Sequence, residues 1–355
     1  MSRIFVAGVG AVSPAGWGVP VLRGALEKAA PLPVQTLARP GWEKTLPVRL
    51  VPNPPARPEF LAHPRLRRTS PITHYAAASA LEAMAALRAN PAAKHLRLGV
   101  VCCLQSGCVQ YSCRFYEEVL KDPATASPLV FPETVYAAPT SHVAALLENV
   151  VLAYSLVGDP SSFLQGVALG AEWLGEDRAD LCLVLGAEEP NWVIADAMHL
   201  LDRTAITAAG AGALCLCKNP DLSNGVELAT ITDAHTFGAK QTRAQAALAM
   251  REELCRATRP ASGASGTIAS PSAGLLCDGL GTSVIGDAAE SAAWSDWNGA
   301  RVSPKKIFGD GLMAGAAWQC VAACDLVAAK KFAAATVSLV GSNQQAIAAR
   351  FTSAG

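Results

Sequence analysis

The chain has 355 residues, and its 29 basic and 29 acidic side chains give it a formal net charge of zero. Charged residues make up 16% of the chain and apolar residues 51%. A neutral, charge-poor chain lacks the basic surface that a nucleic-acid backbone requires, and its high apolar content excludes intrinsic disorder. Charged residues interrupt the most apolar stretches, so none has the roughly 18 uninterrupted apolar residues of a membrane-spanning helix.

Strand and helix patterns alternate along the chain, with a loop rich in proline and arginine at 31–64. The second series of elements, from about residue 242, follows an order similar to that of the first, as an internal duplication would. Short apolar strands alternating with helices predict an α/β fold with sheets covered on their faces. The expected strands are 4–9, 98–104, 181–185, 213–217, 226–231, 267–270, 336–340 and 344–349. The expected helices are 19–29, 69–88, the stretch after Gln110, 141–156, 166–174, 242–257, 282–294 and 311–329.

A glycine-rich turn, Gly8-Val9-Gly10, follows the first strand, as a dinucleotide-binding turn would. The third glycine of that motif is missing, and no second strand ends in an acidic residue about 20 residues later. A tight exit from the strand explains the turn better than a nucleotide site does. No cofactor is expected.

Eleven cysteines are scattered along the chain, several of them within apolar runs. Their spacing does not match a zinc site, so no metal is expected. The first eight residues are too glycine-rich for a signal peptide. The cysteines are therefore expected to be small buried side chains in a protein of the reducing cytoplasm.

Several segments resemble, in the same order, the motifs of the β-ketoacyl synthase family. They are VAGVGAVSPAGWG at 6–18, RRTS at 67–70, FPETV at 131–135, APTSHV at 138–143, GAEE at 186–189 and AGAGA at 209–213. This resemblance implies a thiolase fold, with a duplicated α-β-α-β-α layered core. We expect an N-terminal half at 1–235 and a shortened C-terminal half at 236–355.

The resemblance also implies a cysteine nucleophile at a helix N-terminus and two histidines that stabilise an enolate. Alignment with the family's motifs places Gln165 at the nucleophile's position and Pro271 near the first histidine. Asp310 takes the place of the second histidine, and Lys305 remains as the lysine that supports the degenerate site. None of these three replacements can perform the original chemistry, so we predict a chain that is non-catalytic by itself.

The segment around Gln165 is similar to one in the chain-length factors of type II polyketide synthases. That similarity implies a heterodimer with an active ketosynthase, an acyl carrier protein as donor, and a tunnel for an acyl or polyketide chain, including a polyene. The aromatic residues Tyr111, Phe115 and Tyr116 are candidates for lining this tunnel or its interface.

Two other interpretations remain open. The chain could be a thiolase-fold acyltransferase or condensing enzyme that uses a displaced cysteine, such as Cys103 or Cys108. It could also be a homodimeric pseudoenzyme that acts as a scaffold. The histidines do not favour either one, because His142 fits a packing role and His235 matches no catalytic position of the family.

Overall fold

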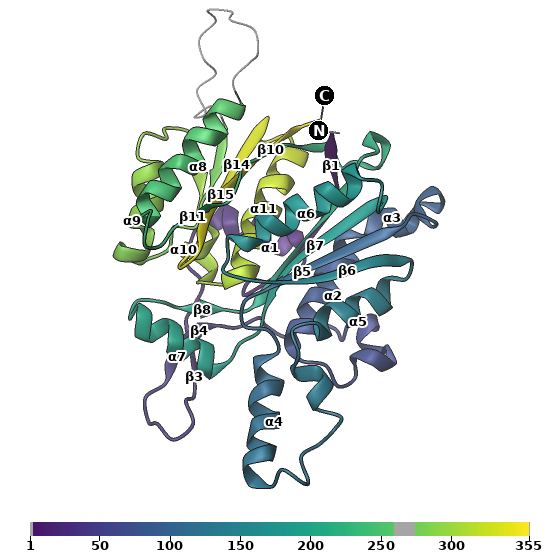
Figure 1. The fold of residues 1–355 in the computed structure, drawn as a ribbon, viewed down its shortest axis with the longest axis vertical. Coiled ribbons are helices and arrows are strands. Elements are labelled where there is room, and N and C mark those ends of the chain that lie inside the picture. Colours follow the sequence, from purple (N-terminus) through teal and green to yellow (C-terminus); the bar gives the residue numbers. More distant parts are fainter. Residues whose placement is uncertain (1–2, 259–273, 355) are drawn as a thin grey trace, which may run out of the picture.

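The computed structural model describes residues 3–258 and 274–354, and a large mixed sheet runs through it (Figure 1). From one edge to the other the main strands follow the order β6-β5-β7-β9-β1-β10-β15-β14-β12-β13. The strands of the first half are β1 (Ile4–Ser13), β5 (Leu98–Leu104), β6 (Val150–Val157), β7 (Leu181–Glu188) and β9 (Gly210–Cys217). Those of the second half are β10 (Val226–Ile231), β12 (Leu275–Cys277), β13 (Ala300–Val302), β14 (Ala334–Val340) and β15 (Gln345–Ser353).

The same strand order occurs twice. In the first half β5 lies parallel to β6 and β7, β9 is antiparallel to β7, and β1 is antiparallel to β9. In the second half β12 lies parallel to β13 and β14, β15 is antiparallel to β14, and β10 is antiparallel to β15. The antiparallel pair β1 and β10 joins the halves. This repeat confirms the predicted duplicated core.

Helices lie in three layers about the two halves of the sheet. Helices α2 and α5 cover the first half and pack against one apolar cluster. Helices α8 and α9 cover the second half and pack against another. Helices α6 and α11 contribute to a third and larger cluster. The helices are α1 (Val19–Lys28), α2 (Pro71–Ala83), α3 (Ala85–Ala89), α4 (Val109–Lys121), α5 (Ala138–Leu147), α6 (Ser162–Gly175), α7 (Trp192–Leu201), α8 (Arg243–Ala257), α9 (Val284–Ala293), α10 (Pro304–Phe308) and α11 (Leu312–Ala328).

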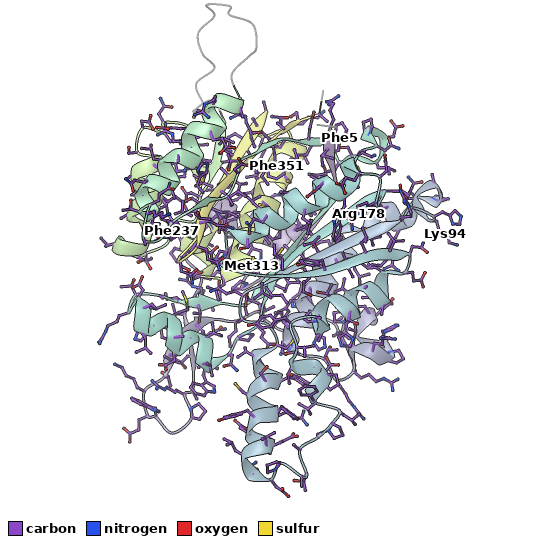
Figure 2. All side chains as sticks on the ribbon, viewed as in Figure 1. Phe5, Lys94, Arg178, Phe237, Met313 and Phe351 are labelled. Atoms are coloured by element: carbon purple, nitrogen blue, oxygen red, sulfur yellow. The ribbon has the colours of Figure 1, made fainter. Side chains whose placement is uncertain are left out.

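Helix α11 is the centre of the middle layer. Apart from the buried Gln319 and Asp325, its residues are apolar or small, which is typical of a helix buried all round. Figure 2 shows Met313, at its start, in the middle of the molecule, and this side chain is fully buried. Gly186 of β7 allows the close packing, since a Cβ there would lie 2.6 Å from the carbonyl oxygen of Met313.

A smaller sheet, β3 (Gln35–Leu37), β4 (Leu46–Arg49) and β8 (Thr207–Ala208), lies beside α7. Two short strands, β2 (Gly16–Trp17) and β11 (His235–Thr236), pair with β1 and β15. Helix α4 extends away from the body of the molecule (Figure 1). Within the described ranges, no helix has both the length and the apolar character needed to cross a bilayer.

The predicted helix at 141–156 is wrong in its second half. Helix α5 ends at Leu147, and the edge strand β6 begins at Val150. Glu148 and Asn149 adopt left-handed φ angles of 59° and 48°, which end the helix. The run Val-Val-Leu-Ala-Tyr-Ser-Leu-Val that follows is rich in strand-forming side chains.

Other differences are smaller. The predicted helix at 69–88 divides into α2 and α3, and the sequence analysis did not anticipate α7 or β13. The expected strand at 267–270 lies outside the described residues.

Candidate functional site

A small cavity of about 70 Å³ lies where the starts of α6, α8 and α11 come together. Pro160 and Ser161 reach it from the start of α6, Arg243 from the start of α8, and Gly311 and Leu312 from the start of α11. Residues from both halves of the fold therefore form one site. Its other lining residues are Met198, Gly279, Lys305, Gly309, Asp310, Gly315, Ala316, Gln319, Leu339, Val340 and Ser342.

Lys305 and Asp310 form an ion pair in the wall of this cavity, with 2.6 Å between Lys305 Nζ and Asp310 Oδ2. Asp310 is held firmly: its backbone N–H donates to the Ile206 carbonyl at 2.7 Å. Its Oδ1 accepts from the Leu312 N–H at 3.1 Å. Two of the four residues named for the degenerate site, Lys305 and Asp310, thus lie together.

The ion pair stabilises the charged form of Lys305. Burial of Lys305 opposes its charged form, but the nearby carboxylates, Asp310 foremost, raise the pKa of its ammonium group. Asp310 therefore lies beside a lysine whose charged form is stabilised. Such a carboxylate accepts hydrogen bonds and cannot donate one to a developing oxyanion.

Gln165 lies on α6 but does not line the cavity. Its Nε2 donates to Gln345 Oε1 of β15 at 3.1 Å. At the start of the same helix, Pro160 and the buried Ser161 border the cavity, and the Ser161 hydroxyl donates to Asp159. The sequence analysis does not name Ser161 as a site residue. Its position could have indicated one, because it follows the loop Gly158-Asp159-Pro160 at the point where a helix begins. Pro271 lies outside the described residues.

Cys103 and Cys108 do not border the cavity either. Their exposed fractions are 0% and 2%, and burial raises the pKa of both thiols. Cys103 lies beneath α6, where a Cβ at Gly166 would come within 2.5 Å of its sulfur. Neither thiol therefore has the exposed, acidic character of a nucleophile.

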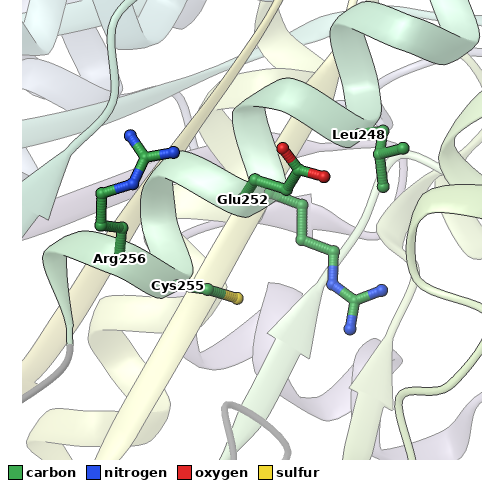
Figure 3. Close-up of a pocket in the computed structure, with 5 residues that line it drawn as sticks. Leu248, Glu252, Cys255 and Arg256 are labelled. Atoms are coloured by element: carbon green, nitrogen blue, oxygen red, sulfur yellow. The ribbon is translucent and has the colours of Figure 1, made fainter.

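A more accessible cysteine, Cys255, lies on the outer helix α8 beside a shallow surface hollow (Figure 3). Leu248, Arg251, Glu252 and Arg256 of the same helix complete this hollow. None of these residues lines the cavity at the helix starts.

The three aromatic tunnel candidates lie on α4, away from the cavity. Tyr111 and Phe115 are half-buried, whereas Tyr116 is 63% exposed. The Phe115 ring packs on Phe131 with 5.4 Å between centroids. The Arg114 guanidinium lies 5.8 Å from the centre of the Tyr111 ring. No residue of α4 is fully buried, and its packing within the described chain is mainly against the short helical turn at Phe131–Thr134.

The histidines and the GAEE segment have structural contacts. His142 pairs with Glu133 at 3.0 Å, and His235 pairs with Glu253 at 2.7 Å. Glu188 accepts hydrogen bonds from the backbone N–H groups of Gln105 and Ser106, and burial raises its pKa to about 7. The Glu188 contacts hold the loop after β5 against β7, the two histidine pairs join neighbouring elements, and none of these residues lines the cavity.

An apolar surface follows the free edge of the sheet. Among the described strands β6 pairs with β5 alone, and its Val151, Tyr154 and Val157 are each about half exposed. A strand of eight residues with apolar side chains and one unpaired edge is a ready site for pairing with another chain. Further exposed apolar side chains occur on α4 and just after it: Tyr116, Leu120, Leu129 and Phe131.

Comparison with known protein families and with curated proteins finds no match. Solved structures do match. A structure described as the ishigamide ketosynthase/chain length factor is 18% identical with a TM-score of 0.81, and the match covers 99% of this chain and all of that one. A β-ketoacyl synthase from Burkholderia phymatum STM815 is 17% identical with a TM-score of 0.82, over the full length of both chains.

A third match is a complex of a type II polyketide synthase acyl-carrier protein with its ketosynthase. It is 15% identical with a TM-score of 0.74, and the match covers 99% of each chain. These alignments extend over almost the whole chain, and the duplicated strand order agrees with them. The chain therefore has the thiolase fold of the ketosynthases and chain length factors.

Proposed function

We propose that this chain is a non-catalytic partner of an active ketosynthase, similar to a chain length factor, and that the resulting heterodimer shapes a tunnel for an acyl or polyketide chain. The observation that carries the proposal is the composition of the cavity. Pro160 and Ser161 at the start of α6 line it, and so does the Lys305–Asp310 ion pair.

The chemistry of condensation explains why the composition of the cavity matters. A thiolate must hold the acyl chain, and hydrogen-bond donors must stabilise the enolate that forms. Within the described part of the chain, no cysteine or histidine lines the cavity. The Asp310 carboxylate would repel an enolate, and the loss of one oxyanion donor alone reduces rates by about 10²- to 10³-fold.

The free edge of the sheet supports the heterodimer. Strand β6 and α4 together present apolar side chains to solvent on one side of a chain whose core is otherwise well covered. Large apolar interfaces of this kind are typical of obligate complexes. A partner that pairs with β6 would also cover α4, and Tyr111 and Phe115 would then lie at the interface.

A second surface supports a carrier protein as donor. Arg57, Arg65, Arg67 and Arg68 are exposed, and none of them takes part in an ion pair of the described residues. Arginine binds carboxylates and phosphate in a bidentate manner, so this cluster fits an acidic, phosphate-bearing carrier.

Product length tests the proposal. The chain is reconstituted with the ketosynthase encoded beside it, a carrier protein and extender units, and the products are analysed by mass spectrometry. Phe115→Ala should enlarge the tunnel and lengthen the product, and Phe115→Trp should shorten it. The matched control Leu248→Ala changes an exposed apolar residue on α8 and should leave the product unchanged. A product length that ignores both changes at Phe115 contradicts the proposal.

A further inference from the structure

Helix α4 carries Tyr111 and Phe115, yet little of the described chain fixes its direction. It buries no residue fully and packs mainly against the turn at Phe131–Thr134. It extends from the body of the molecule (Figure 1), so a small rotation at its base displaces its far end the most. The contacts at the base of α4 therefore decide where its side chains lie.

The first turn of α4 lacks the groups that usually cap a helix. Its N-cap residue, Cys108, makes no side-chain hydrogen bond to this turn, and the turn contains no acidic residue. Helix α2 begins in the same way, because the Ser70 side chain does not cap it and its first turn contains no acidic residue either. The free N–H groups at both helix starts therefore need an acceptor from elsewhere in the chain.

Glu189, directly after β7, supplies that acceptor to both helices. Its Oε1 accepts from the Gln110 N–H of α4 at 2.7 Å, and its Oε2 accepts from the Ile72 N–H of α2 at 3.3 Å and from the Ser70 hydroxyl. The residue is only 3% exposed. Burial raises the pKa of Glu189, and these three donors oppose the rise because they bind its charged form. One carboxyl group thus joins two helix N-termini, where the partial positive charge of each helix favours it.

The two helices differ in how firmly the rest of the molecule holds them. Helix α2 packs against β1, β7 and β9 and is buried along most of its length, whereas α4 has no such core. A second hydrogen bond at the base of α4 also leads to the end of β7, since Gln110 Nε2 donates to the Pro190 carbonyl at 2.7 Å. Glu189 therefore ties the loosely packed helix to the firmly packed one.

We propose that Glu189 is a positioning residue for the tunnel. By capping α2 and α4 together, it sets the direction in which α4 leaves the body of the molecule, and so the place of Tyr111 and Phe115. Its effect on product length rests on the proposed function, whereas its effect on α4 stands on contacts within this chain alone.

Single-molecule fluorescence energy transfer on the purified chain tests the effect on α4. One dye is attached at Lys121, the last residue of α4, and the other at Lys94, an exposed residue of the body, through unnatural amino acids at both sites. Glu189→Gln keeps the volume of the side chain but replaces one acceptor oxygen by an NH₂ group, so one helix start loses its cap. The distribution of distances between the dyes should become about twice as broad or more, since the loss of such a contact frees the segment that it holds.

Glu82→Gln is the matched control. Glu82 lies near the other end of α2 and caps α1 in a similar way, with the Val19 and Ala11 N–H groups donating to its carboxylate at 2.8 and 2.9 Å. This variant should lose stability but leave the distances to α4 unchanged. An unchanged distribution in Glu189→Gln overturns the inference. An equal broadening in Glu82→Gln overturns it too, because the broadening then reflects a general loss of stability.

The product length of the reconstituted complex tests the effect on the tunnel. Glu189→Gln should raise the share of products that differ from the main length by about threefold or more, because one methylene group in an apolar pocket already changes discrimination by roughly 10- to 200-fold. An unchanged product distribution, where the Phe115 variants do change it, overturns the role of Glu189 and leaves the proposed function intact. If the Phe115 variants have no effect either, the proposed function fails, and the distance measurement alone decides whether Glu189 directs α4.

A second variant keeps the inference testable if Glu189→Gln does not fold. Glu189→Asp retains the negative charge but shortens the side chain by one methylene group, so it cannot reach both helix starts at once. The distances between the dyes should broaden in this variant as well. An unchanged distribution overturns the inference.

Discussion

At the scale of single residues, the Lys305–Asp310 pair defines the character of the site. Asp310 stands 15% exposed and Lys305 33% exposed, and the carboxylate is bound to a backbone N–H as well as to the ammonium group. A partly buried charge that loses its partner is strongly destabilised, whereas removal of both charges costs less.

This pair leads to a stability prediction. Asp310→Asn should lower the free energy of unfolding by about 1–2 kcal/mol, less than for a fully buried pair because water reaches Lys305. The double variant Lys305→Met/Asp310→Asn should lower the free energy of unfolding by less than the sum of the two single changes. Urea unfolding measures both values. Arg114→Ala, which breaks an exposed pair with Glu118, should cost only a few tenths of a kcal/mol. An Asp310→Asn variant as stable as the parent contradicts this account.

Glu188 leads to a prediction about pH. Burial raises its pKa from 4.5 to about 7, so the folded chain binds this proton more tightly than the unfolded chain does. Its contribution to stability is complete below pH 4.5 and is lost as the pH rises to about 7. In Glu188→Gln the free energy of unfolding should therefore decrease less between pH 4.5 and about 7 than it does in the parent chain. Glu118→Gln is the control, because the pKa of Glu118 is lowered and that carboxyl titrates below the range. Equal pH profiles for Glu188→Gln and the parent chain would rule out this role.

At the scale of elements, β6 is the feature on which assembly depends. It is the edge strand of the first half, and its outward apolar side chains have no partner within the described chain. The strand also shows a limit of sequence analysis. The sequence pattern predicts a helix through its run of Val, Leu and Tyr, because residue type alone does not reveal the left-handed φ angles of Glu148 and Asn149 that separate α5 from β6.

Strand β6 leads to a prediction about assembly. Tyr154→Lys places a charge on the free edge, and lysine at such an edge opposes strand pairing. The complex with the ketosynthase should weaken by at least about tenfold, since an interface core tolerates an unpaired charge poorly. Tyr154 is 52% exposed, so the chain itself should remain folded by circular dichroism. Multi-angle light scattering measures the complex.

Val284→Lys is the matched control, because Val284 is 89% exposed on α9 in the other half. It should leave the complex intact. A Tyr154→Lys variant that binds the ketosynthase as tightly as this control does would show that β6 is not the interface.

The sequence predicts this fold better than it predicts the site. Apolar strands alternating with helices, and the repeated order of elements, indicate the layered core directly. Lys305 and Asp310 could be placed because the spacing of Lys305, Gly309 and Asp310 matches a motif of the ketosynthases. Ser161 could not, since only the helix boundary shows that it, and not Gln165, borders the cavity. Contacts such as Asp159 to Gln344 join residues far apart in the chain and depend on tertiary packing.

At the scale of the whole molecule, the neutral and apolar composition has a structural explanation. Most of the apolar side chains lie between the layers, and α11 is buried along nearly its whole length. Exposed apolar side chains occur at β6 and on α4, and also singly or in pairs elsewhere, as at Trp42, Leu200, Leu201 and Val284. A chain with a layered core, a small cavity whose described lining residues include no thiol, and an apolar sheet edge is suited to act within a complex.

One measurement tests this account most directly. The complex of this chain with its ketosynthase is incubated with an acyl-carrier thioester, and the intact mass of each chain is determined. We predict an acyl adduct on the ketosynthase alone, with this chain at its unmodified mass. An acyl adduct on this chain, whether at Ser161 or at a cysteine, would contradict the claim that it is a non-catalytic subunit.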